Sequence, residues 1–203
     1  EYEITNQWNF WVFPEFIPIL SGVSVSCDPL ILEKYKNIFS KVRLNNNDNV
    51  SGVRIVSELN KDTVDFIAKG GSVILLGNHP FPALPTTFQI LVAGRVQGNL
   101  ATVIEDHPLM NRFPHDGFCD WQFYNMIENG KAVLFNDLNI PFKPIVEVVS
   151  SFKLIRKQAN LFEMSVGKGR LLVCTLNLSE TDAAAMYLLG TMINYVNSNE
   201  FNP

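Results

Sequence analysis

The sequence has little of what thiol and metal chemistry requires. Its 203 residues include only three cysteines, Cys27, Cys119 and Cys174, and these lie far apart without a CxxC pair. Structural zinc sites use closely spaced ligand pairs, so this spacing argues against a thiolate metal site. An odd cysteine count also leaves at least one free thiol, which does not indicate a disulfide scaffold. We therefore expect neither a metal nor any other cofactor.

Clustered basic charge is also missing. The chain has 16 Lys and Arg against 20 Asp and Glu, and its formal net charge is −4. A general nucleic-acid binder needs a clustered basic surface, and here the basic residues are scattered. We expect no nucleic-acid partner.

The sequence shows neither a long apolar run nor a segment with the pattern of a leader peptide. No apolar run approaches the length that crosses a bilayer, so we expect no membrane span. Glu1 opens directly into strand-like sequence, without the basic and then apolar pattern of a signal peptide. We expect the chain to be a piece of a longer or processed protein.

What is present first is an alternation of strand and helix patterns. Asp28 and Pro29 have the residue types of a helix N-cap and first turn, and the apolar strand SVILLG is typical of a parallel sheet. This order predicts an α/β fold with a mostly parallel, doubly wound sheet and flanking helices. The elements expected in this part are a strand at 23–26, a helix at 29–40, a strand at 53–56, a helix that Asn60 caps and that runs through Ala68, and a strand at 72–77.

The remaining patterns are less regular. Residues 1–13 are rich in aromatic and β-branched side chains, which favours an N-terminal β extension. The glycines of Val166–Arg170 indicate a hairpin. The further elements expected are strands at 88–96, 131–135, 145–149, 159–166 and 170–176, a short helix within 102–112, and helices at 121–128 and 180–196.

Reactive and aromatic side chains gather between His107 and Ile127, in HPLMNRFPHDGFCDWQFYNMI. Another histidine, His79, follows the strand SVILLG, where ligand sites form in parallel sheets. We therefore predict a ligand site or an interdomain contact in this region. The residues predicted for it are His79, His107, His115, Asp116, Asp120, Trp121 and Gln122.

No pattern indicates a catalytic residue. The turn after SVILLG reads Asn78-His79-Pro80 instead of presenting a Ser or Cys between glycines, and no GxSxG or GxCxG occurs. The glycines of Val166–Arg170 lie in a hairpin, so their amides do not extend a helix N-terminus toward a phosphate. Cys119 with His115 is the one nucleophile–base pair to consider, and it leaves open a divergent hydrolase.

The N-terminal aromatic residues Trp8, Phe10 and Trp11 allow two interpretations. Aromatic faces pack against sugar rings, so these side chains could form a stacking platform. They could equally cover an apolar surface of a neighbouring domain or of this one.

Several stretches resemble a known family. NQWNFWVFP at 6–14 resembles the strand that leads out of the last β-sandwich in Bacteroidetes-type glycoside hydrolases related to family two. KGGSVILLG, the 107–127 segment and LFEMSVGKGRLLVCTLNL are similar to the domain that follows, which has a class I glutamine amidotransferase-like, flavodoxin-like fold. The resemblance implies a strand and linker at 1–20 and one α/β domain at 21–203.

The resemblance implies a noncatalytic accessory domain of a secreted or periplasmic, β-galactosidase-like glycoside hydrolase. Active amidotransferases carry a cysteine at the strand-end turn, where this chain has His79, so glutaminase activity does not carry over. The expected role is interdomain packing, oligomerisation or cleft shaping, and the expected partners are the other domains of the parent enzyme, with a homo-oligomer also possible. Two alternatives stay open, namely a carbohydrate-binding module that uses Trp and Asp or Gln side chains, and the divergent hydrolase.

Overall fold

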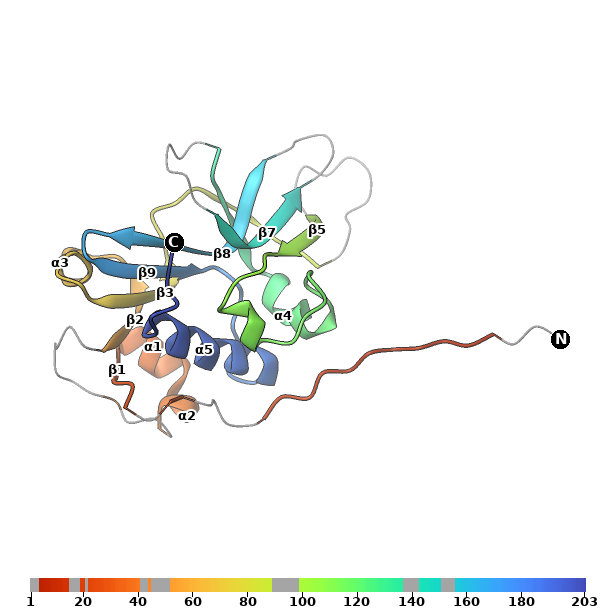
Figure 1. Ribbon diagram of the computed structural model, residues 1–203, viewed down its shortest axis with the longest axis horizontal. Coiled ribbons are helices and arrows are strands. Elements are labelled where there is room, and N and C mark those ends of the chain that lie inside the picture. Colours follow the sequence, from red (N-terminus) through yellow and green to blue (C-terminus); the bar gives the residue numbers. More distant parts are fainter. Residues whose placement is uncertain are drawn as a thin grey trace.

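The computed structural model describes residues 4–14, 19–20, 22–40, 44, 52–88, 99–136, 143–150 and 156–203. The described residues form one nine-stranded mixed sheet with a main strand order of β1-β2-β3-β9-β8-β6-β4, and β5 and β7 extend it beside β8 (Figure 1). The strands are β1 (Val25–Cys27), β2 (Val53–Glu58), β3 (Ser72–Asn78), β4 (Ala83–Pro85), β5 (Asn99–Ile104), β6 (Lys131–Leu134), β7 (Pro144–Ser150), β8 (Lys157–Val166) and β9 (Gly169–Cys174). The helices are α1 (Pro29–Lys34), α2 (Lys36–Phe39), α3 (Lys61–Ala68), α4 (Tyr124–Ile127) and α5 (Ala183–Val196), with 3-10 turns η1 (Met110–Arg112) and η2 (Trp121–Phe123).

One half of the sheet is parallel, as the strand and helix alternation predicts. Strands β1, β2, β3 and β9 pair in parallel in that order. The predicted caps are confirmed, because Asp28 accepts a hydrogen bond from the Ile31 amide at 2.8 Å and Asn60 accepts one from the Thr63 amide at 2.9 Å. Gly70 ends α3 with a φ of 111°, a conformation that favours glycine. Short-range signals therefore placed this half correctly.

The other half corrects the expected fold. Strands β4, β5, β6, β7, β8 and β9 are joined by five antiparallel pairings, so the prediction of a mostly parallel sheet is wrong. The α/β class is confirmed. The short helix expected within 102–112 is replaced by the end of β5 and the turn η1, since Pro108 interrupts the segment. The strand expected at 88–96 lies almost wholly outside the described residues.

Helices cover both faces of the sheet. Helices α1, α2 and α5 pack in one buried cluster with Ile74 and Leu172, and α3 packs in a second cluster with Val73 and Leu171. Because side chains alternate between the two faces of a strand, neighbouring residues of β3 and β9 enter different clusters. None of the helices in the described ranges is long and apolar enough to cross a membrane.

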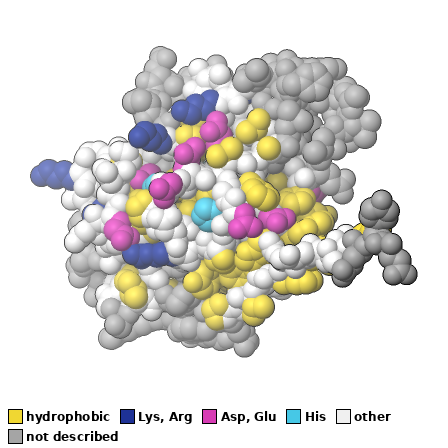
Figure 2. Space-filling model, turned by 45° about the vertical axis from the view of Figure 1, so that its right-hand side comes forward, with side chains coloured by type: hydrophobic (Ala, Val, Ile, Leu, Met, Phe, Trp, Pro, Cys, Tyr) yellow, Lys and Arg dark blue, Asp and Glu magenta, His cyan; other side chains and the backbone are white. Residues whose placement is uncertain are grey.

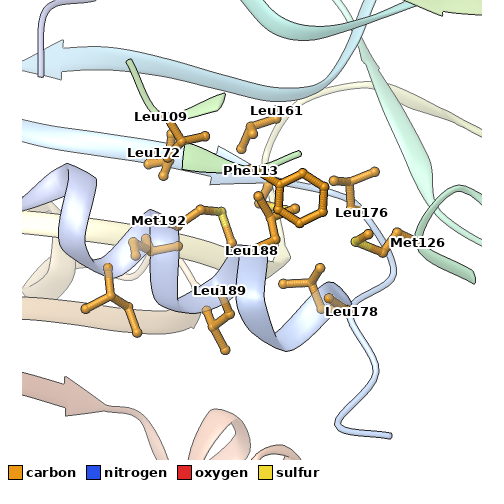
Figure 3. Close-up of a cluster of buried hydrophobic side chains, with 14 of the residues drawn as sticks. Leu109, Phe113, Met126, Leu161, Leu172, Leu176, Leu178, Leu188, Leu189 and Met192 are labelled. Atoms are coloured by element: carbon orange, nitrogen blue, oxygen red, sulfur yellow. The ribbon is translucent and has the colours of Figure 1, made fainter. Parts of the chain in front are cut away.

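Helix α5 and the 107–127 segment meet in the larger cluster (Figure 3). Leu188 and Met192 lie on the side of α5 that faces Phe113, whereas Leu189 lies on the opposite side of the helix. Leu109, Met110, Phe113, Phe123, Met126 and Ile127 of the 107–127 segment are all buried. This segment, which is the richest in reactive side chains, is thus also a structural layer of the core.

Residues 4–14 form an arm that extends away from the body (Figure 1). They are in no strand of the described sheet, so the predicted N-terminal β extension is not formed within this chain. At the base of the arm, Phe13 stacks on Phe113 with 5.4 Å between ring centroids and lies equally close to Tyr187 of α5. The arm is therefore attached by one aromatic anchor.

Candidate functional site

Two cavities lie near the two ends of α5. The first, which we call the arm groove, has a volume of about 500 Å³ and is lined by the arm, η2 and the start of α5. Its side chains include Trp8, Phe10, Trp11, Phe13, Trp121, Gln122, Asn125 and Asp182. The second, which we call the acidic cavity, has a volume of about 680 Å³. Its charged and titratable side chains are Glu105, Asp106, His107, Lys143, Glu147, Lys157 and Glu163.

The arm groove brings the three tryptophans of the chain together. Trp8 and Trp121 are 71% and 65% exposed. Trp121 is supported from behind by Phe88, at 5.6 Å between centroids, and by Tyr124 at 6.1 Å. Trp121 therefore presents a ring to solvent. Figure 2 shows hydrophobic side chains gathered over the part of this face from which the arm leaves.

Polar groups line the same groove at its floor. The Gln122 side chain is only 7% exposed, and its Nε2 donates to the Pro114 carbonyl at 3.1 Å. Its buried Oε1 has no hydrogen-bond partner. Beside it, Asn125 Nδ2 donates to Asp182 Oδ2 at 3.0 Å, while Asp182 Oδ1 accepts from the amides of Ala184 and Ala185. An unsatisfied buried acceptor next to exposed aromatic rings is a place where a ligand hydroxyl or amide could donate.

The polar residues between the two cavities serve the backbone. His115 Nδ1 accepts from the Gly117 amide at 2.9 Å, and Asp120 accepts from the Trp121 amide at 2.8 Å at the start of η2. Asp116 is exposed, next to Gly117, whose φ is 86°. None of these three lines either cavity. These residues are close in the sequence, but they do not form one site with the residues that line the cavities.

His79 lies apart from the other predicted residues. It follows β3, and its ring stacks on Phe81 with 6.1 Å between centroids. Burial lowers the pKa of His79 from its usual value, which favours the neutral imidazole. Among the described residues, no group of three His, Cys, Asp or Glu side chains lies close enough to hold a metal ion.

In the acidic cavity, His107 meets two residues that sequence reasoning missed. His107 Nε2 lies 3.4 Å from Glu163 Oε1 on β8 and 3.3 Å from the Tyr195 hydroxyl on α5. The Leu109 amide donates to His107 Nδ1 at 3.3 Å, so the neutral ring carries its proton on Nε2 and can donate it to Glu163. Burial and the Glu163 carboxylate raise the pKa of Tyr195.

Glu163 is the least satisfied charged group of this set. Its side chain is 3% exposed, and its Oε2 has no hydrogen-bond partner. One signal in the sequence could have identified it, because it is the only charged residue of β8 between Ala159 and Val166. Alternation places it on the same side of the strand as Leu161, which faces the core.

The thiols are unsuited to nucleophilic catalysis. Burial raises the pKa of Cys27, Cys119 and Cys174 to about 12 each. At neutral pH such thiols stay protonated, whereas the thiolate is the nucleophile. His115 contacts the Gly117 amide, and no hydrogen bond joins it to Cys119 in the described part of the chain. This geometry argues against a hydrolase that uses Cys119 and His115.

The carboxyl ends of β1 and β2, where parallel sheets bind ligands, hold a smaller pocket of about 360 Å³. Its polar groups are engaged within the chain. Asp28 accepts from the Ser57 amide and hydroxyl as well as from Ile31, and Arg54 pairs with Asp62 at 2.7 Å. The pocket thus contributes to the stability of the parallel half.

Comparison with known proteins gives a family but no activity. A family model described as Domain of unknown function (DUF8487) matches residues 54–203. No curated protein matches the chain. Among solved structures, the chain is similar to a β-galactosidase from Bacillus circulans sp. alkalophilus, with a TM-score of 0.29 and 13% identity over 68% of this chain. The match covers 21% of that β-galactosidase, and so low a TM-score does not establish a shared fold.

Proposed function

We propose a function for this chain from its geometry. The chain belongs to the family described as Domain of unknown function (DUF8487), and that description names no activity. The function that the geometry supports best is that of a noncatalytic interaction domain. In this role the arm at 4–14 docks on a neighbouring domain of the parent polypeptide.

The observation that carries the proposal is the exposure of apolar side chains along the arm. Ile4, Trp8, Phe10 and Val12 are 86%, 71%, 87% and 95% exposed. Surface hydrophobic residues that occur singly need no explanation, but a contiguous apolar stretch is typical of an interaction site. A neighbouring domain that covers the arm would remove this area from water, at roughly 25 cal/mol per Å².

The pattern along the arm indicates how it docks. Phe10 and Val12 are exposed, whereas Trp11 and Phe13 are half-buried against the body, so exposure alternates from residue 10 to residue 14. Alternation with a period of two is that of a β-strand, whose side chains point to opposite faces. The arm pairs with no strand in the described part of the chain. It therefore has the form of a strand that completes a sheet in a partner, a known mode of β-strand addition.

Hydrogen exchange tests the docking. We expect the amides at 4–12 to exchange within seconds in the isolated chain and at least about a hundredfold more slowly in the complete natural polypeptide. The amides of α5 should exchange equally slowly in both, which controls for global stability. Equal, rapid exchange of the arm in both preparations would contradict the proposal.

The identity of the parent protein is part of the same proposal. We propose that the parent is a secreted or periplasmic, β-galactosidase-like glycoside hydrolase, in which the chain serves packing, oligomerisation or cleft shaping. The sequence resemblance of 6–14 and of the α/β body supports this proposal. The complete polypeptide should then hydrolyse an aryl β-glycoside, while the isolated chain should hydrolyse none. Turnover by the isolated chain would contradict the noncatalytic role.

A second function, carbohydrate binding, is favoured by the arm groove. Three tryptophans line one cavity together with the unsatisfied Gln122 Oε1 and the amide of Asn125. Aromatic faces and amide groups are what a sugar ring requires. The earlier candidates Asp116 and Asp120 do not line this groove, so Gln122 and Asn125 take their place as hydroxyl partners.

Calorimetry with a panel of β-galactosides and β-glucosides distinguishes the two functions. Binding requires heat at millimolar sugar and its loss in Trp121→Ala, and Phe118→Ala is the matched control because Phe118 is exposed but lies outside the groove. If no sugar produces heat, carbohydrate binding is excluded and docking remains. If a sugar binds and the arm amides still exchange rapidly in the complete polypeptide, carbohydrate binding becomes the first proposal and docking the second.

A further inference from the structure

We propose that the acidic cavity binds a small organic ammonium ion, with Glu163 as the residue that anchors its charge. This site lies near the C-terminal end of α5 and uses none of the residues of the arm groove. The inference therefore goes beyond the docking function and does not depend on it.

The first argument is the incomplete hydrogen bonding of Glu163. Its Oε1 lies 3.4 Å from His107 Nε2, and the Tyr195 hydroxyl also hydrogen-bonds the carboxylate. Within the described part of the chain its Oε2 still has no partner. A buried carboxylate that lacks donors carries a desolvation penalty that its neighbours do not offset. Unsatisfied buried groups in native proteins require an explanation, and a ligand that supplies the missing donor is one. Glu163 lines the cavity, so a ligand there lies next to it.

The second argument is the sign of the charge. Among the described residues, Glu105, Asp106, Glu147 and Glu163 line the cavity as acidic groups, and Lys143 and Lys157 line it as basic groups. With every one of these groups ionised, the cavity keeps an excess of two negative charges. Tyr195 adds no charge, because burial raises its pKa. The balance attracts a cation and repels an anion.

The third argument is the size and chemistry of the space. About 680 Å³ lies within the range of roughly 300–1,000 Å³ that is typical of small-molecule sites. An ammonium group has three donors, and Glu163 together with the neutral side chains of Ser165 and Asn202 on the cavity wall offers oxygen acceptors for them. In the described residues no cluster of three ligands suits a bound metal ion. A compact organic amine therefore fits better than a metal cation.

Calorimetry with the full chain tests the proposal. The probes are methylammonium and 1,4-diaminobutane, and 1,4-butanediol is the neutral control of the same length as the diamine. We expect heat from at least one amine and none from the diol. Glu163→Gln, which keeps the shape and removes the charge, should weaken binding at least about tenfold. Glu33→Gln, on the exposed side of α1, should leave it unchanged.

Three results would overturn the proposal. They are the absence of heat from both amines, equal binding of the diol, and unchanged affinity in Glu163→Gln. If Glu163→Gln does not fold, Glu147→Gln on the cavity wall takes its place. Binding weakened several-fold by that variant supports the proposal, and unchanged binding overturns it. Trp121→Ala, in the arm groove, should not affect amine binding, because Trp121 does not line the acidic cavity. The proposals for the two cavities therefore fail independently.

Discussion

The two ends of α5 carry carboxylates in opposite circumstances. At the N-terminal end, Asp182 accepts from two backbone amides and from Asn125. Near the C-terminal end, Glu163 is more deeply buried, contacts His107 and Tyr195, and has one oxygen with no partner among the described residues. Asp182 is satisfied by its own chain, so it stabilises the fold. One oxygen of Glu163 lacks a donor among the described residues, so a ligand explains this group better than stability does.

The 107–127 segment connects these two ends. Its first residue, His107, lines the acidic cavity, and Trp121 and Gln122 near its end line the arm groove. Between them, Phe113 and Phe123 pack 5.0 Å apart in the core. The segment thus supplies one wall of each cavity from one buried support, and the clustering of its reactive side chains in sequence does not indicate one active site.

The largest expected effect comes from removing this shared support. Phe113→Ala deletes a buried ring that contacts Phe13, Phe123 and Tyr187, and should lower the free energy of unfolding by about 3–5 kcal/mol in urea titrations. Phe118→Ala is the control, because Phe118 is 46% exposed in the same segment and should change stability by less than about 0.5 kcal/mol. Similar losses in both variants would mean that the segment does not support the two cavities in this way.

Alkaline pH tests the burial of the segment through Cys119. Burial raises the pKa of this thiol from 9.0 to about 12, so the folded state holds the proton more tightly than the unfolded state. Its contribution to stability is therefore complete below pH 9 and is lost as the pH rises toward 12, at about 1.4 kcal/mol per pH unit. Urea titrations at pH 8 to 11 under reductant should show a shallower decline in Cys119→Ser. If the free energy of unfolding falls equally steeply with pH in both proteins, the Cys119 thiol is solvated in the folded state.

At the satisfied end of α5, Asp182→Ala should destabilise the chain. It removes the N-cap of α5 and the acceptor of the Asn125 amide, and a cap of this kind is worth about 1 kcal/mol. Thermal or urea unfolding measures the loss. Asp182→Asn, which keeps an acceptor oxygen, should recover most of it, and failure to recover would assign the effect to charge alone.

At the unsatisfied end, Glu163→Gln should produce the smallest change and one of opposite sign. The amide keeps an acceptor for His107 and removes a buried negative charge, so stability at neutral pH should stay equal or rise by up to about 1 kcal/mol. A loss as large as that of Asp182→Ala would show that Glu163 is a structural residue. The difference between the two ends of α5 would then disappear.

Local chemistry is the part of the fold that could be predicted. Asp28 with Pro29, and Asn60, were predicted to begin helices because a cap acts over three or four residues. The hairpin at Gly167, with a φ of 62°, was predicted for the same reason. The antiparallel half was not, because pairings such as β6 with β8 join residues far apart in sequence, and strand patterns do not encode their partner.

The candidate site shows the same division. Trp8, Trp11, Trp121 and Gln122 were recognised by residue type, and the fold brings them to one groove. Glu163 and Tyr195 were missed, because each sits in an element that looked like ordinary core. Only their position beside His107 makes them notable. His79, by contrast, follows the predicted strand and yet lies apart from the other candidates.

By itself, the sequence determined the α/β class, the helix caps, the apolar faces and the lack of a nucleophile at the turn after β3, since each depends on residue type and short spacing. Only the tertiary structure decided the mixed sheet, the exposure of the arm and the division of the 107–127 side chains between two cavities. The physical reason is that strand pairing and burial are set by contacts between distant segments. The hydrogen bonding of a buried carboxylate such as Glu163 depends on donors from residues that are distant in the sequence.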